Sequence, residues 1–160
     1  MQQNYAFRYP SLVRALFASP TMINGWAHYS ERMMIEEGWG KTDQRMQVTQ
    51  LKWEIRRVLQ TIIDQKAHTQ EMSRSEALAL LTSEGFMETG TAEMVWRRVQ
   101  LRPVLASADY IGKELILDLR RRYQQRVAQD FSLNQFHKQL LSFGSPPVKY
   151  LRSRLLTGDL

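Results

Sequence analysis

The sequence predicts an all-α fold, arranged as an array of about seven or eight helices. Apolar side chains recur at helical spacing through most of the 160 residues, and no stretch shows the strict alternation of a half-buried strand. Proline, glycine and capping residues divide the chain into segments of helix length. Hydrophobic residues make up 43% and charged residues 24% of the chain, which is typical of one globular domain over residues 1–160.

Proline and glycine delimit the first two predicted helices. Pro10 lies near the first position of a helix that reaches about Phe17, before Ser19-Pro20 ends it. A second helix runs from about Thr21 to Glu37. Gly38 then occupies the position just after a helix at which glycine is favoured.

A long third helix is predicted from about Asp43 to Ala67. Its apolar side chains cover a wide arc, so we expect a central helix. These side chains are Met46, Leu51, Trp53, Ile55, Val58, Leu59, Ile62 and Ile63.

Capping signals place the remaining helices. The capping-box pattern Ser73–Glu76 opens a helix that Gly85 ends, and Ser132–Gln135 repeats the pattern before a helix that ends near residue 143. Pro103 separates a helix over about 91–101 from a long one over about 108–129. Pro146-Pro147 precedes a last helix that reaches about residue 156.

The net charge of +6 is concentrated in residues 101–160, where Arg120, Arg121, Arg122 and Arg126 form the densest basic patch. Such a patch attracts phosphate or acidic proteins, but it is more often the solvated face of a helix. The arginines spread around the helix with a single aromatic neighbour, which does not favour nucleic-acid binding. The sequence has no cysteine, which excludes disulfides, a thiolate nucleophile and cysteine-ligated metals.

The common catalytic signatures are absent, including His-Glu-x-x-His, a phosphate-binding glycine loop and Gly-x-Ser-x-Gly. One segment is nevertheless unusual. On the second predicted helix Asn24, His28 and Glu31 share a face, which Trp26 and Tyr29 flank. Polar groups beside apolar ones are costly to bury without partners, so this face predicts either hydrogen bonds between helices or a functional site.

The segment Asn24–Gly38 resembles the signature Glu-Gly-Trp-Ala-x-Tyr-x-Glu of the bacterial domain-of-unknown-function eight-eight-five family. Further stretches keep the order and spacing of that family's motifs, and the similarity covers nearly all of the chain. These stretches are Thr91–Pro103, Tyr110–Arg120, Phe131–His137 and Gly144–Pro147. Gln60–His68 departs from the family pattern, because it keeps an aspartate and a histidine but loses an arginine and a glycine.

The resemblance implies the fold of gluzincin-type zinc metallopeptidases, which hydrolyse a peptide or a related amide. In the family a His-Glu-x-x-Pro-Gly-His motif precedes the region matched here. Its histidines bind zinc together with the glutamate that opens Glu-Gly-Trp. Asn24 occupies that third position, and a neutral amide is a poorer zinc ligand than a carboxylate. We therefore expect the C-terminal part of such a protein, a partial domain without the upstream zinc motif. We expect no metal ligand or cofactor in this chain, zinc only in complete family members, and no activity of the chain alone.

The same resemblance implies roles for single residues. His28 and Glu31 are expected in or behind the substrate cleft, and Tyr110 is expected to donate a hydrogen bond to the oxyanion. Tyr110 lies one residue after the family's tyrosine, whose position Asp109 takes. The residues expected to contact substrate are Trp26, Tyr29 and Arg98. Structural roles are expected for His68 and His137.

Two classes of function stay open. In the first, the chain forms one wall of a peptidase cleft and binds the missing N-terminal half or a second copy of itself, with Met22, Ile23 and Trp26 as an exposed apolar patch. In the second, it is a non-catalytic helical module whose basic surface binds an acidic protein or a nucleic acid. The N-terminal residues show no signal peptide and no segment predicts a membrane span, so cytoplasm and periplasm are both compatible with the sequence.

Overall fold

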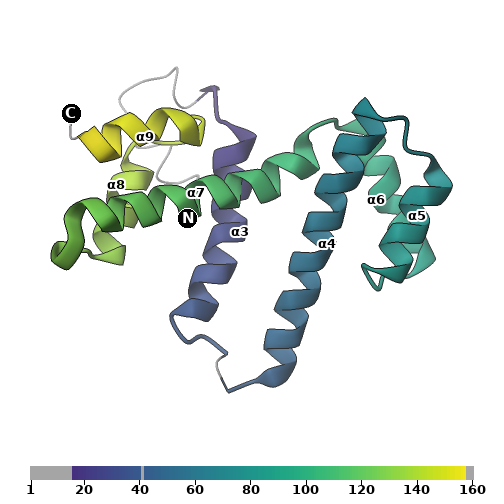
Figure 1. The fold of residues 1–160 in the computed structure, drawn as a ribbon, viewed down its shortest axis with the longest axis horizontal. Coiled ribbons are helices and arrows are strands. Elements are labelled where there is room, and N and C mark those ends of the chain that lie inside the picture. The colour runs from purple at the N-terminus through teal and green to yellow at the C-terminus, as the bar shows by residue number, and fades with distance from the viewer. Residues whose placement is uncertain (1–15, 41, 158–160) are drawn as a thin grey trace. The chain divides into compact units, whose positions relative to one another are not determined.

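The computed structural model describes residues 16–40 and 42–157, and all regular secondary structure among them is helical (Figure 1). The predicted all-α fold is confirmed, whereas the helix predicted from Pro10 lies almost wholly outside the described residues. No helix in the described ranges is both long and apolar enough to cross a membrane. The α-helices are α3 (Pro20–Glu36), α4 (Gln44–Thr69), α5 (Arg74–Ser83), α6 (Thr89–Leu101), α7 (Leu105–Val127), α8 (Leu133–Ser142) and α9 (Val148–Thr157), and a 3-10 helix, Ala128–Asp130, follows α7.

Several helix ends follow from local contacts that the sequence predicts. The Asp43 carboxylate accepts hydrogen bonds from two backbone N–H groups in the first turn of α4, at 2.9 and 3.3 Å. Ser73 and Glu76 form the complete capping box of α5. After α3 and α8, Gly38 and Gly144 have φ angles of 96° and 80°, which glycine adopts without steric cost.

The chain divides into two compact units, which are described separately. Unit 1 holds the described residues up to Tyr29 and from Ile111 onward, and unit 2 holds Ser30–Tyr110. The prediction of one domain over residues 1–160 stays a prediction. In unit 2, helices α4, α5 and α6 lie side by side (Figure 1). Their core consists of Leu59, Ile63, Ala77, Leu81, Met87, Ala92, Trp96 and Val99.

Unit 1 buries apolar side chains from α3, α7, α8 and α9. The α8 and α9 side chains repeat at helical spacing, as expected for amphipathic helices. The buried members are Met22, Tyr29, Ile116, Leu119, Tyr123, Phe136, Leu140, Leu141, Val148, Leu151 and Leu155.

Two glycines set the closest approach of α3 and α7 within unit 1. A Cβ atom added to Gly25 would lie 2.4 Å from the backbone carbonyl carbon of Gly112. One added to Gly112 would lie 2.1 Å from the carbonyl oxygen of Thr21. No larger residue fits at either position unless the helices move apart. Both glycines belong to the motifs that carry the family resemblance, so the helix crossing gives these motif positions a structural reason.

One face of α4 is more exposed than the sequence predicts. Val48, Leu51, Ile55 and Ile62 are 64%, 60%, 43% and 37% exposed, and their spacing places them on one arc of the helix. The prediction of a central helix is therefore wrong for this face of α4, whose apolar side chains are exposed. The predicted exposed patch is also wrong at Met22, which is fully buried. Exposed apolar side chains gather on α4 instead.

Candidate functional site

Trp26 and Tyr29 of α3 form a cluster with His137 of α8 in unit 1. The Tyr29 hydroxyl and the Nε2 atom of His137 share a hydrogen bond of 2.7 Å. The ring centroids of Trp26 and His137 lie 5.2 Å apart with an interplanar angle of 87°, an edge-to-face contact. Tyr29 is fully buried, whereas Trp26 is half-buried. The structure thus brings together two of the residues predicted to contact substrate.

His137 is a neutral histidine at the pH of most cells. Burial is the main cause that lowers its pKa from 6.5 to about 4, and the positive charge of Arg120 contributes in the same direction. A neutral imidazole has one donor and one acceptor nitrogen, and Nε2 is engaged with Tyr29. The sequence predicts a structural role for His137 but not this contact, which joins residues 108 positions apart.

His28 and Lys113 are buried polar residues of unit 1, each 1% exposed. His28 lies on the same buried face of α3 as Met22 and Gly25. The Lys113 ammonium nitrogen lies 3.1 Å from a carboxylate oxygen of Glu114. In this chain His28 belongs to the packed interior, and its predicted role in a cleft stays a prediction. Asn24, one turn before it, is half-buried.

Glu31 forms a two-hydrogen-bond ion pair with Arg57 of α4, in unit 2. The Arg57 guanidinium donates to the two carboxylate oxygens of Glu31 at 2.6 and 2.9 Å, and it lies 3.5 Å from a carboxylate oxygen of Asp109. Tyr110, the next residue of α7, is half-buried. Glu31 thus belongs to an ion-pair network with Arg57 and Asp109. The roles predicted for Glu31 and Tyr110 at the substrate cleft stay predictions.

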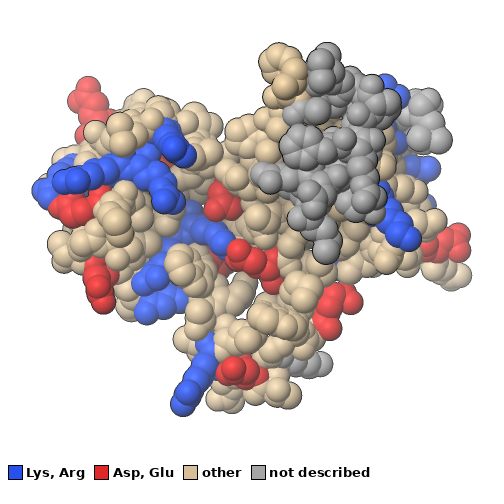
Figure 2. Space-filling view, turned by 180° about the vertical axis from the view of Figure 1, so that it is seen from behind, with Lys and Arg blue, Asp and Glu red and all other residues tan. Residues whose placement is uncertain are grey.

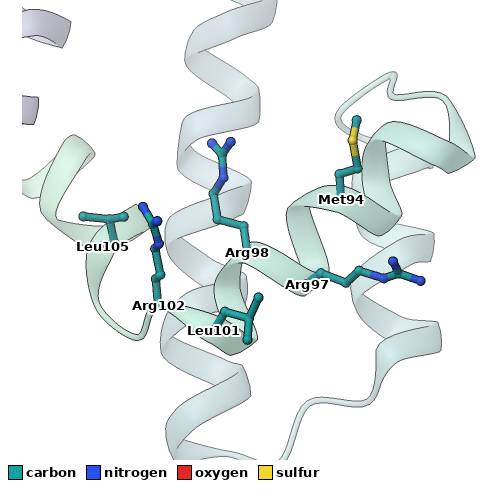
Figure 3. Close-up of a pocket in the computed structure, with 6 residues that line it drawn as sticks. All are labelled: Met94, Arg97, Arg98, Leu101, Arg102 and Leu105. Atoms are coloured by element: carbon teal, nitrogen blue, oxygen red, sulfur yellow. The ribbon is translucent and has the colours of Figure 1, made fainter.

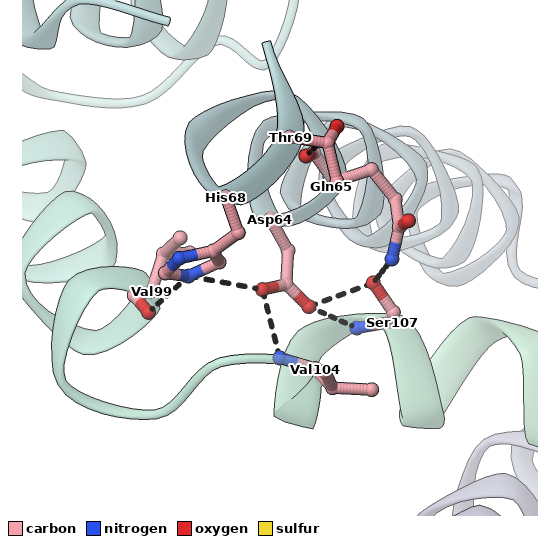
Figure 4. Close-up of polar contacts among 7 residues, drawn as sticks. All are labelled: Asp64, Gln65, His68, Thr69, Val99, Val104 and Ser107. Carbon is pink, nitrogen blue, oxygen red and sulfur yellow. Dashed lines mark hydrogen bonds and ion pairs between the residues drawn. The ribbon is translucent and has the colours of Figure 1, made fainter. Parts of the chain in front are cut away.

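A buried polar cluster joins α4 to the end of α6 and the start of α7 (Figure 4). Asp64 is 1% exposed, and its carboxylate accepts hydrogen bonds from the Val104 N–H at 3.0 Å, the Ser107 N–H at 2.9 Å and the Ser107 hydroxyl at 2.7 Å. His68 donates from Nε2 to the Val99 carbonyl oxygen at 3.1 Å. Val104 has a φ angle of 71°, which is rare for a β-branched residue. The aspartate and histidine retained from the family pattern thus hold the turn between two helices.

The basic patch predicted on α7 is largely paired. Arg121 and Arg122 lie 2.5 and 2.6 Å from the Asp118 carboxylate oxygens, and Arg126 donates to the Leu155 carbonyl oxygen at 2.5 Å. These contacts reduce the charge that this patch offers to a partner. Lys and Arg side chains also gather over the part of unit 2 that holds α5 and α6 (Figure 2). Arg98, the third predicted substrate contact, is exposed on α6.

The family model described as "Bacterial protein of unknown function (DUF885)" matches residues 1–155. The chain belongs to this family. A solved candidate lipoprotein of unknown function from Shewanella oneidensis is 41% identical to this DUF885 chain, with a TM-score of 0.91 over 97% of this chain and 28% of that chain. A candidate lipoprotein from Colwellia psychrerythraea is 23% identical, with a TM-score of 0.89 over 98% of this chain and 27% of that chain, and supports the fold alone.

This DUF885 chain therefore spans less than a third of the length of the two solved proteins. No curated protein matches it at a significant level. The DUF885 motifs account for Trp26 and Tyr29, which sequence reasoning singled out. Sequence reasoning missed Arg57, which pairs with Glu31, and the contact between Tyr29 and His137, because a pairing across 26 or 108 positions leaves no periodic signal in one sequence.

Proposed function

We propose that this chain is the C-terminal helical part of a longer zinc-metallopeptidase-like protein, in which it forms one wall of the substrate cleft. The observation that carries the proposal is the match to the S. oneidensis protein, which covers 97% of this chain but 28% of that chain at 41% identity. This fold occurs there as part of a longer polypeptide. The peptidase class rests on the resemblance of the motifs to gluzincins.

The exposed face of α4 supports the proposal that another segment of the same longer polypeptide packs against it. Val48, Leu51, Ile55 and Ile62 form a stripe of the kind against which a neighbouring helix packs. Each large apolar side chain that becomes fully buried contributes about 1.5–3 kcal/mol, so leaving such a stripe in water forgoes stability. We propose that another segment of a longer DUF885 protein covers it.

The residues that the structure describes do not fit a zinc site of their own. Within residues 16–40 and 42–157, no three His, Asp or Glu side chains form a group that could hold a metal ion. Asn24 offers a neutral amide where the resemblance places a carboxylate ligand. We therefore assign no step to a metal bound by this chain, and we propose that it does not hydrolyse peptides alone.

The contribution that we propose for this chain is substrate contact. Trp26 presents a half-buried indole in contact with the Tyr29 and His137 rings, an aromatic surface suited to an extended peptide. His28, Glu31 and Tyr110 are the candidates for positioning roles in the complete cleft. The S. oneidensis protein is described as a candidate lipoprotein, and by similarity we propose a cell-envelope location for the longer protein.

A chimera tests this proposal. In it, this chain replaces the matching 28% of the S. oneidensis protein, and the measurements are zinc affinity and chelator-sensitive hydrolysis of peptides. We expect Asn24→Glu to raise the zinc affinity of the chimera by at least about tenfold, because a carboxylate replaces an amide. Ala27→Glu is the matched control, since it adds the same charge at an exposed position of α3.

Two results would contradict the proposal at different levels. Equal zinc affinities for the Asn24→Glu and Ala27→Glu chimeras would show that position 24 is not a ligand position. A parental S. oneidensis protein without zinc-dependent hydrolysis would rule out the peptidase class itself.

A further inference from the structure

A pocket of about 530 Å³ opens on the surface of unit 2, at the end of α6 and the start of α7 (Figure 3). Its volume falls in the range of roughly 300–1,000 Å³ that is typical of small-molecule sites. All of its lining residues come from one continuous segment of unit 2. They are Met94, Arg97, Arg98, Leu101, Arg102 and Leu105.

Three arginines give the pocket a strong positive charge. Arg98 and Arg102 are one helical turn apart, and both extend to the same side of the ribbon in Figure 3, whereas Arg97 points away from them. No carboxylate lines the pocket, and within the described part of the chain none of the three guanidinium groups takes part in an ion pair. The like charges of Arg98 and Arg102 repel each other, and a bound anion would relieve this repulsion.

Apolar side chains surround these charges. Leu101 is 81% exposed and Met94 is 66% exposed, while Leu105 is half-buried. Water is a poor environment for large apolar side chains, and an alkyl chain laid along them would remove apolar surface from it. The combination of two adjacent guanidinium groups with an apolar wall matches a ligand that has an anionic head and an apolar tail.

The buried cluster of Figure 4 holds the backbone that carries the pocket. Asp64 accepts hydrogen bonds from Val104 and Ser107, just after Arg102, and His68 donates to Val99, just before it. Arg98 in the last turn of α6 and Arg102 just after the helix therefore project from backbone that this cluster anchors. A fixed site loses less conformational entropy when a ligand binds.

We propose that this pocket binds a single-chain anionic amphiphile, such as an alkyl phosphate or a fatty-acid carboxylate. Arg98 and Arg102 hold the head group by paired N–H donors, which match the oxygens of phosphate and carboxylate. Met94 and Leu101 contact the chain. This site lies within one unit, and the proposal does not depend on the peptidase proposal above.

Isothermal titration of the purified chain tests the site with three probes, namely decyl phosphate below its micelle concentration, inorganic phosphate and the neutral decyl maltoside. We expect decyl phosphate to bind with one-to-one stoichiometry and at least about tenfold tighter than either other probe. Arg98→Gln is expected to weaken decyl phosphate binding by about tenfold. Arg152→Gln, which removes the same charge from an exposed position of α9, is expected to leave it unchanged.

A further variant separates the head group from the tail. Leu101→Gln is expected to weaken the binding of decyl phosphate and to leave the binding of inorganic phosphate unchanged. Because Arg98 and Leu101 are exposed, both Arg98→Gln and Leu101→Gln are expected to keep the far-UV circular dichroism of the parent. Equal affinities for inorganic and decyl phosphate would reduce the pocket to an anion site and overturn the proposal. Equal affinities of the parent and Arg98→Gln for decyl phosphate, or equal affinities of the parent for decyl phosphate and decyl maltoside, would overturn it as well.

Discussion

Asp64 shows how much of unit 2 depends on one carboxylate. Its oxygens accept three hydrogen bonds from the start of α7, and Asp64→Asn would turn an amide N–H₂ group toward backbone donors. We expect Asp64→Asn to lower the free energy of unfolding by about 1–3 kcal/mol. Chemical denaturation monitored by circular dichroism measures this. Asp43→Asn is the matched control, because asparagine caps an exposed helix start as well as aspartate does. Equal losses in the two variants would contradict the role assigned to Asp64.

His137 makes the stability of unit 1 depend on pH. Its pKa is about 4 in the folded chain and near 6.5 in the unfolded chain, so the unfolded state binds more protons between these values. The contribution of neutral His137 to the free energy of unfolding is therefore fully present above pH 6.5, and it is lost as the pH falls toward 4. Urea unfolding at several pH values from 7 to 5 is expected to show a smaller decrease for His137→Gln than for the parent. Parallel pH profiles of the two proteins would contradict this.

Single residues were predictable where their contacts are local. Ser73 caps the helix that begins beside it, and the sequence predicts this cap. For Asp43 the sequence predicts only that a helix begins near it, and the structure shows that its carboxylate caps that helix. Asp64 and His137 contact residues far along the chain, and no spacing rule predicts such pairs. Helical spacing placed Trp26 and Tyr29 beside the polar face of their helix, whereas their role as substrate contacts was predicted from motif resemblance alone.

At the scale of elements, the crossing of α3 and α7 depends on two positions without side chains. Gly25→Ala would place a Cβ atom against the backbone of Gly112, and we expect a loss of about 1–3 kcal/mol or more in the free energy of unfolding. Gly90→Ala is the control, because its Cβ would meet nothing within 4 Å in the first turn of α6. It is expected to raise stability by up to about 1 kcal/mol. Thermal unfolding of the two variants and the parent measures these changes. A Gly25→Ala variant as stable as the parent would contradict the close crossing of α3 and α7.

The exposed face of α4 predicts a difference between the chain alone and the longer protein. Leu51→Gln together with Ile55→Gln is expected to change the stability of the chain by no more than about 0.5 kcal/mol, because both side chains are exposed. In the chimera the same two substitutions are expected to lower the free energy of unfolding by about 2 kcal/mol or more, because the partner segment buries these residues there. Similar effects in both proteins would contradict a partner on this face.

Helix boundaries were predictable within a few residues, because caps, prolines and glycines lie next to the ends that they set. The predicted helix over about 21–37 is α3, and the one over 43–67 is α4. What α4 packs against was not predictable, since its apolar arc indicates a partner but not whether that partner lies in the same chain. Leu51 and Ile55 illustrate this, because the pattern marks them as core and the structure leaves them exposed.

At the scale of the whole molecule, the all-α class follows from the sequence, and membership of the DUF885 family follows from motifs spread over nearly all of it. The function does not follow from helical pattern, because a helical array has no catalytic chemistry of its own. The proposed cleft wall rests on Trp26 and Tyr29, on the unpartnered face of α4 and on the share of the S. oneidensis protein that this chain spans.

We propose that this chain contributes a helical wall to a longer peptidase and binds no zinc on its own. Metal analysis of the purified chain after incubation with zinc, combined with a peptide-hydrolysis assay in the presence and absence of a chelator, tests it most directly. The expected result is substoichiometric zinc and no chelator-sensitive hydrolysis. Stoichiometric zinc together with chelator-sensitive turnover by the chain alone would contradict the claim.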